Sequence, residues 1–152
     1  MSSTEKDTAV ASHDESCPGK RLDHVAIAVE NLEEALKFYR DGLGLTFLET
    51  EVVEEQGVRV AKLSTGNTHI ELLEPLSPDT PVGKFIAKNG PGLHHICLGV
   101  ENILENLALL KEQKTKLINE EPKIGAGGAQ IAFVHPKATG GVLLELSQPR
   151  AR

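Results

Sequence analysis

One stretch of the chain recurs 71 residues further on, and this internal repeat restricts the possible folds more than any other feature. Residues 22–36 and 93–107 are identical at seven of 15 positions, where chance would give about one. Both copies run from an apolar segment through an Asn into a stretch with helical spacing. Such a repeat indicates two equivalent modules that bury their apolar faces together.

Each module is predicted to have the order strand, helix, strand, strand, strand. In the first, the helix begins at the N-cap Asn31 and spans 31–40, and the strands are at 22–29, 46–53, 58–64 and 68–74. In the second, the helix begins at the N-cap Asn102 and spans 102–113, and the strands are at 93–100, 115–120, 130–134 and 141–147. We therefore predict an α+β fold in which two tandem βαβββ modules form a curved mixed sheet around one site.

The two modules are expected to make one domain over residues 21–149. Module one covers 21–74 and module two covers 93–148. The connector between them, 75–92, contains four prolines and is predicted to hold a short helix at 81–89.

The composition excludes several functional classes. With 16 basic and 22 acidic residues the net charge is −6, and only 3% of residues are aromatic, so no nucleic-acid surface is expected. No segment has the ~20 apolar residues of a membrane span, and two cysteines make no disulfide framework. Residues 1–20 lack periodicity, a secretory signal and an Arg-rich transit peptide. We expect a disordered tail there and a cytoplasmic protein, or a mitochondrial matrix protein if the chain is a processed eukaryotic form.

The first strand of each module places a His and small residues on one face, because side chains alternate along a strand. His24 is followed on its face by two Ala, and His95 by Cys97 and Gly99. Small neighbours leave a concavity beside each imidazole. A candidate site therefore lies on this face of both modules.

The last strand of each module carries a carboxylate within an apolar run. Glu145 is the stronger candidate, because its strand is apolar on both sides, whereas Glu71 alone could be a surface charge. Carboxylates are almost never fully buried unless they are paired or bound to a metal. If the modules curl together, two His and two Glu converge on one cavity, and this ligand set suits a divalent transition metal.

Three further histidines and a cysteine are assigned lesser roles. His69 shares a face with Glu71 and is expected to line the cavity, whereas His94 falls on the opposite face. His135 follows a strand end and is expected at the rim. Cys97 is interpreted as a small buried side chain.

Two lysines, at 123 and 137, occur near a glycine-rich loop at 125–128. The loop lacks the spacing of a phosphate-binding P-loop. Lys123 and Lys137 either meet an anionic ligand or are ordinary surface lysines.

Seven stretches of the chain carry a resemblance to a known family. They are LDHVAIAV (22–29), EEQGV (54–58), ELLEPL (71–76), GLHHICLGV (92–100), EEPKIGAGG (120–128), FVHPK (133–137) and GVLLEL (141–146). With the paired modules, they resemble the vicinal oxygen chelate superfamily of glyoxalases and bleomycin-resistance proteins, and within it the methylmalonyl-CoA epimerases. The resemblance covers roughly residues 21–148.

This resemblance implies a divalent metal, commonly Co²⁺, with Mn²⁺, Ni²⁺ or Zn²⁺ as alternatives, held by His24, Glu71, His95 and Glu145. It implies methylmalonyl-CoA as substrate and interconversion of its (2R) and (2S) epimers by proton abstraction at carbon 2 through a metal-stabilised enolate. Glu145 is expected to act as the base, and Lys123 and Lys137 to contact CoA. The resemblance also implies a homodimer and a place in propionate metabolism, with no nucleic acid or membrane as partner.

The chain departs from the family at position 60. Some members have a Glu three residues after the Gly that corresponds to Gly57, where this chain has Val60. Inversion is expected to need a second acid/base, and the sequence leaves the step open: Lys62, His69 or water serves, or the enolate rotates or is reprotonated differently. Two alternative functions also stay open: a glyoxalase I-type lactoylglutathione lyase, which uses a similar ligand set, and a metal-free binding protein of the same fold.

Overall fold

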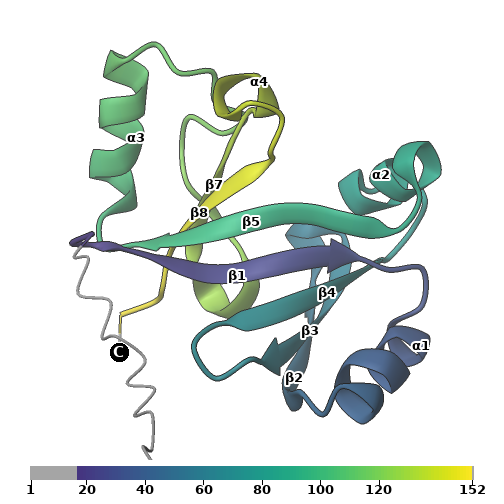
Figure 1. The fold of residues 1–152 in the computed structure, drawn as a ribbon. Helices are drawn as coiled ribbons and strands as arrows, with labels where there is room; N and C mark the ends of the chain where they lie inside the picture. The colour runs from purple at the N-terminus through teal and green to yellow at the C-terminus, as the bar shows by residue number, and fades with distance from the viewer. Residues whose placement is uncertain (1–16, 152) are drawn as a thin grey trace, which may run out of the picture.

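One mixed sheet of eight strands organises the computed structural model, which describes residues 17–151. The strand order is β2-β3-β4-β1-β5-β8-β7-β6 (Figure 1). The strands are β1 Lys20–Ala28, β2 Thr46–Val53, β3 Val58–Ser64, β4 His69–Pro75, β5 Gly92–Val100, β6 Lys123–Ile124, β7 Gln130–Val134 and β8 Leu144–Gln148. This confirms the predicted α+β class with a curved mixed sheet.

The centre of the sheet is an antiparallel pair formed by the first strand of each half. β1 pairs with β5 in antiparallel orientation, and each also pairs in parallel with the last strand of its own half, β4 or β8. Four strands that begin or end a module therefore lie side by side. The face that carries His24, Glu71, His95 and Glu145 is called the inner face below, and the opposite one the outer face.

Two equivalent helices cover the ends of the outer face. α1 (Leu32–Leu36), which continues into the π-helical η1 (Lys37–Gly42), buries Leu32 and Leu36 against β3 and β4. α3 (Ile103–Glu112) buries Ile103 and Leu107 against β7 and β8. Both begin as predicted, because the side chains of Asn31 and Asn102 accept hydrogen bonds from the N–H groups three residues on.

A third helix lies on the inner face. α2 (Pro81–Asn89) has the bounds that were predicted for the connector. Its Val82 is buried against Ala26, Ala28 and Leu73, so the helix covers one end of the concave side (Figure 1). The remaining elements are short: η2 (Glu54–Gln56), η3 (Ala126–Gly128) and α4 (Pro136–Thr139). No helix among residues 17–151 combines the length and apolar character needed to cross a membrane.

The predicted strand at 115–120 is wrong. Only an isolated bridge joins Leu117 to Val134. The N–H groups of Ile118 and Asn119 both donate to the carbonyl of Phe133, and the Asn119 side chain accepts from the N–H of Phe133. The Asn119 side chain thus replaces a backbone carbonyl that would accept this hydrogen bond in a regular strand pair. The strand that pairs with β7 forms instead at β6.

Most of the tail predicted for 1–20 lies outside the described residues. Within 17–20, a turn joins the N–H of Lys20 to the carbonyl of Cys17, and β1 begins at Lys20. The Gly19 carbonyl also accepts from the N–H of Glu101. The first strand therefore begins two residues before the strand predicted at 22–29, and it includes the last residue of the predicted tail.

Candidate functional site

The inner face encloses a cavity of about 740 Å³. Both halves of the sheet and α2 contribute to its walls, and all four candidate metal ligands line it: His24, Glu71, His95 and Glu145. These four side chains are only 4–7% exposed. Buried imidazoles and carboxylates in one cavity are typical of a metal or catalytic site.

Strand register explains why these side chains meet. Ala26 of β1 lies opposite both Glu71 and His95, and Cys97 of β5 lies opposite both His24 and Glu145. Each ligand pair is thus separated by a small side chain on the strand between them. Both small residues have zero exposure, so they form the floor beneath the ligands, in agreement with the interpretation of Cys97.

Three of the candidate ligands surround one point. The Oε2 atom of Glu145 lies 2.7 Å from Nε2 of His95 and 3.4 Å from Nε2 of His24, and the two Nε2 atoms are 3.2 Å apart. Adjacent ligands around an ion with bonds of about 2.1 Å are themselves about 3 Å apart. The triangle therefore fits a divalent transition metal both in size and in its nitrogen and oxygen donors.

Glu71 approaches His24 from the other side. Its Oε2 atom lies 2.5 Å from Nδ1 of His24, and Oδ2 of Asp23 is 2.7 Å from the same nitrogen. His69 completes this group, with Nε2 3.8 Å from both carboxylates. Since one imidazole cannot direct both nitrogens to one ion, Glu71 joins the other three ligands only if its carboxylate or the ring of His24 turns.

The cluster keeps the carboxylate of Glu145 ionised. Burial opposes the charge of Glu145, but hydrogen bonds from His24 and His95 outweigh it and lower the pKa of Glu145 to about 2. Burial likewise opposes the charge of His24, but hydrogen bonds with Asp23 and other cluster members raise its pKa. Burial and the charge of His95 lower the pKa of His94 to about 4. An ionised Glu145 is in the form that binds a cation or accepts a proton.

The alternation of side chains along a strand did not identify two residues that line the cavity. Asp23 and His94 both line the cavity, whereas His94 was expected on the opposite face, which is wrong. The register between β1 and β5 shifts at both positions, between Leu22 and His24 and again opposite His94. Each shift leaves one residue unpaired and redirects its side chain, as a β-bulge does. Asp23 could have been found from the sequence, because its carboxylate directly precedes a candidate His ligand.

The remaining candidates divide between the cavity and the surface. Lys62, His69 and Lys123 line the cavity. Lys137 and His135 do not: Lys137 lies in α4, and His135 caps that helix by accepting a hydrogen bond from the N–H of Lys137. Sequence reasoning also missed Lys84 and Lys88, which reach the cavity from α2.

Comparison with known proteins identifies the family. A model of the glyoxalase/bleomycin resistance protein/dioxygenase superfamily matches residues 23–133. Human mitochondrial methylmalonyl-CoA epimerase is 48% identical over 129 residues, 84% of this chain and 73% of that protein. The ethylmalonyl-CoA/methylmalonyl-CoA epimerase of Cereibacter sphaeroides is 45% identical over 130 residues, 84% of this chain and 97% of that protein.

A solved structure shows the same fold. The Streptomyces coelicolor methylmalonyl-CoA epimerase in complex with 2-nitronate-propionyl-CoA has a TM-score of 0.82 and 40% identity, and the match covers 88% of this chain and 96% of the other. The chain therefore belongs to the glyoxalase/bleomycin resistance protein/dioxygenase superfamily, within the family that contains the methylmalonyl-CoA epimerases.

Proposed function

We propose that this chain is a metal-dependent epimerase that interconverts (2R)- and (2S)-methylmalonyl-CoA. The observation that carries the proposal is the buried triangle of His24, His95 and Glu145 at the wall of a cavity large enough for an acyl thioester. The identity to named epimerases supports the choice of substrate.

The side chains suit a divalent ion, with Co²⁺ proposed and Mn²⁺, Ni²⁺ or Zn²⁺ as alternatives. His24, His95, Glu145 and, after a side-chain turn, Glu71 would hold it. When bound, such an ion acts as a Lewis acid toward the thioester oxygen and makes the proton at carbon 2 more acidic.

Glu145 is proposed as the base that takes this proton. Its carboxylate is ionised, and one oxygen remains for proton transfer when the other is a ligand. Inversion then requires proton delivery from the opposite face of carbon 2. Two candidates line the cavity beside Glu71: Lys62, which lies opposite Glu71 in the β3–β4 pair and 3.3 Å from Glu49, and His69.

Isotope exchange tests the proposal. The metal-loaded protein should exchange the hydrogen at carbon 2 of both epimers with D₂O. A chelator should abolish exchange in both epimers, and Glu145→Gln should abolish it in the epimer whose proton Glu145 takes. A metal-loaded sample that exchanges neither epimer contradicts the proposal. Formation of S-lactoylglutathione by the same sample would establish the lyase, and a protein that binds no metal would support the binding-protein alternative.

The same assay separates the two candidates for the second acid/base. In Lys62→Met or His69→Gln, loss of the second group should leave hydrogen exchange in one epimer while inversion is lost. The variant that behaves in this way identifies the residue. Unchanged inversion in both variants would exclude both residues and leave water or rotation of the enolate.

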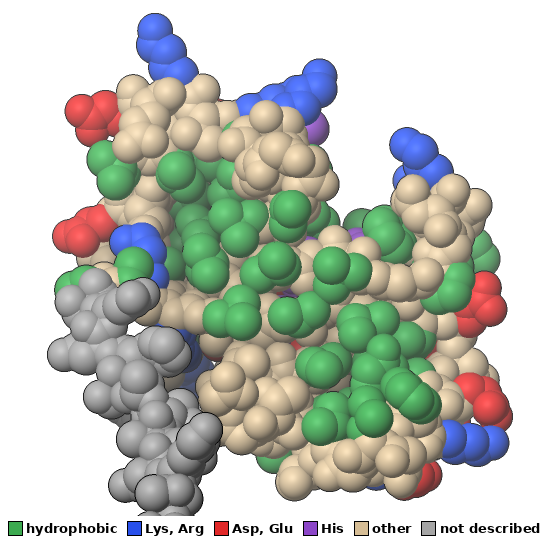
Figure 2. Space-filling model, in the orientation of Figure 1, with side chains coloured by type: hydrophobic (Ala, Val, Ile, Leu, Met, Phe, Trp, Pro, Cys, Tyr) green, Lys and Arg blue, Asp and Glu red, His purple; other side chains and the backbone are tan. Residues whose placement is uncertain are grey.

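We also propose that a second copy of the chain covers the middle of the outer face. Figure 2 shows hydrophobic side chains gathered over β1 and β5, between α1 and α3. Leu22 and Leu93 are 43% and 59% exposed there, and an exposed apolar patch of this kind is typical of an interface. Leu93→Glu should shift the mass measured by light scattering from dimer to monomer, whereas Leu104→Glu on the exposed side of α3 should not. A wild-type monomer would contradict this assignment.

A further inference from the structure

The cavity is lined by charged side chains of both signs. Its lining includes three carboxylates, Asp23, Glu71 and Glu145, and all three contact His24. Six cationic side chains also line it: Arg21, Lys62, Lys84, Lys88, Lys123 and Arg150. Arg21 lies 3.4 Å from Asp23, and Lys62 lies opposite Glu71. The cavity lining thus holds more cations than carboxylates, although the chain has a net charge of −6.

α2 presents two of these cations from one helix face. Lys84 and Lys88 are four residues apart, which places them one above the other, and Phe85 lies beside them in the cavity wall. The ring of Phe85 packs against His94 at 4.9 Å, and Nδ1 of His94 lies 2.8 Å from Nδ1 of His95. A continuous wall thus runs from the candidate metal ligands to the two lysines.

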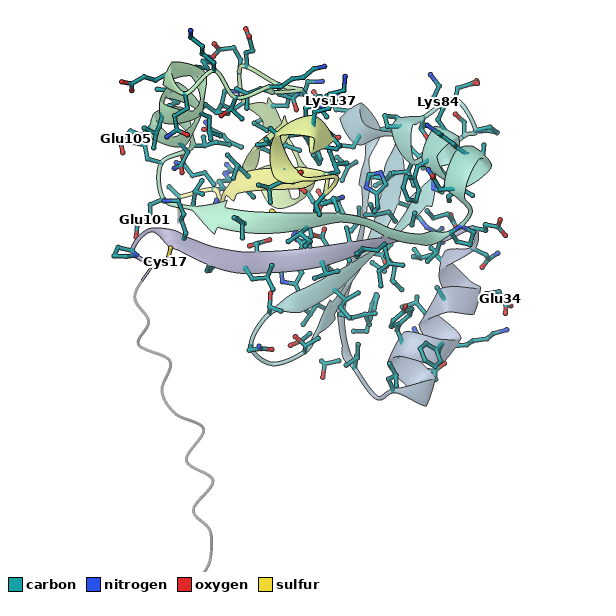
Figure 3. The ribbon with its side chains drawn as sticks, turned by 45° about the horizontal axis from the view of Figure 1, so that its top comes forward. Cys17, Glu34, Lys84, Glu101, Glu105 and Lys137 are labelled. Atoms are coloured by element: carbon teal, nitrogen blue, oxygen red, sulfur yellow. The ribbon has the colours of Figure 1, made fainter. Side chains whose placement is uncertain are left out.

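The position of α2 is closely fixed. The Thr80 side chain caps the helix by accepting a hydrogen bond from the N–H of Gly83. Gly83 packs so tightly that an added Cβ would lie 2.4 Å from the carbonyl oxygen of Ser77. The two lysines therefore extend from a well-anchored element, and Figure 3 shows Lys84 projecting from α2.

Neither lysine is neutralised within residues 17–151. Among the described residues, no carboxylate forms an ion pair with Lys84 or Lys88, whereas Lys37 pairs with Glu34 at 2.8 Å and Lys111 with Glu121 at 3.5 Å. Two free ammonium groups on one face attract an anion with more than one charge. Lysine is a common phosphate ligand in proteins.

We infer that Lys84 and Lys88 form a subsite for the phosphate groups of a CoA thioester, with Phe85 beside the apolar part of its arm. The choice of CoA as the carrier rests on the proposed function. The acyl group must reach the His24–Glu145 cluster, and the phosphates lie at the far end of a long flexible arm. The cationic wall of α2 also offsets the repulsion that a chain of charge −6 exerts on an anionic substrate.

A comparison of two thioesters tests the subsite. Methylmalonyl-CoA carries the phosphates, and methylmalonyl-pantetheine lacks them. The double variant Lys84→Glu/Lys88→Glu should raise KM for the CoA thioester by roughly 10-fold or more for each lost charged contact. Its kcat/KM for the pantetheine thioester should be unchanged. Lys84→Gln/Lys88→Gln should also raise KM for the CoA thioester alone. The rise in KM should be smaller, because charge is removed rather than reversed.

A matched control makes the same change of charge elsewhere. Lys37 and Lys111 lie outside the cavity lining, so Lys37→Glu/Lys111→Glu should leave KM for both thioesters unchanged. The subsite is overturned if the α2 variant lowers kcat/KM equally for both thioesters. It is also overturned if the variant lowers kcat/KM for neither of them.

Calorimetry with coenzyme A itself separates this inference from the proposed function. Coenzyme A should bind the wild-type protein and bind the α2 variant more weakly, whether or not the protein is an epimerase. If the wild type exchanges neither thioester, the proposed function fails and calorimetry alone decides the subsite. Equal binding by both proteins, or no binding by the wild type, overturns it.

Discussion

At the scale of single residues, Asp23 is the side chain that orients His24. Its hydrogen bond to the imidazole lowers the pKa of Asp23, although burial opposes the charge. The carboxylate lies 2.7 Å from Nδ1 of His24, so it favours the tautomer in which Nε2 is free to bind an ion. Carboxylates behind metal-binding histidines commonly have this role.

Asp23→Asn should therefore weaken metal binding without unfolding the protein. The substitution keeps the shape and removes the charge, and we expect a loss of affinity on the order of 10- to 100-fold. Competition with a chromogenic chelator measures it. Asp41→Asn is the control, because Asp41 forms a surface ion pair with Arg40. Equal affinities in Asp23→Asn and wild type would show that the hydrogen bond does not serve the metal site.

At the scale of elements, α2 depends on a glycine within its first turn. A helical Gly→Ala change usually stabilises a protein by about 1 kcal/mol. At Gly83 the added Cβ would lie 2.4 Å from a backbone oxygen, so we expect Gly83→Ala to lower the free energy of unfolding by about 1–3 kcal/mol. Urea denaturation measures the change. In Gly42→Ala the Cβ meets its nearest atom at an ordinary 3.5 Å, and no loss is expected. Equal stability of Gly83→Ala and wild type would mean that the backbone at Ser77 moves away from the added Cβ at little cost in free energy.

Elements with a strong local signal could be predicted from the sequence, and those set by tertiary contacts could not. β2, β3, β7 and α2 have the predicted bounds, because alternation, turn glycines and a Thr-Pro start mark them locally. The prediction of a strand at 115–120 was wrong because Asn119 bonds to β7 through its side chain.

The alternation of side chains also placed the four ligand candidates on one face. It cannot reveal a bulge, so His94 was placed on the wrong face and Asp23 was missed. Lys84 and Lys88 were missed because the packing angle of a helix on a sheet is a tertiary property.

At the scale of the whole molecule, two opposing charges act on an anionic substrate. The net charge of −6 repels it, whereas the cationic residues of the cavity attract it. The two differ in range, because the repulsion comes from the whole surface and the attraction from a few groups near the ligand. Salt screens both, with a screening length of about 10 Å at 0.1 M and about 3 Å at 1 M.

The sign of the salt dependence shows which charge dominates. If the cavity cations dominate, KM for methylmalonyl-CoA should rise as salt is added, because their attraction is screened. Steady-state assays in KCl over about 0.1 to 1 M measure this. In Lys84→Glu/Lys88→Glu the slope should reverse, because only repulsion remains at α2. Methylmalonyl-pantetheine, which lacks the phosphates, should show a weaker dependence in both proteins. A KM that falls with salt in the wild type would mean that the net charge governs binding and that the cavity cations do not compensate for it.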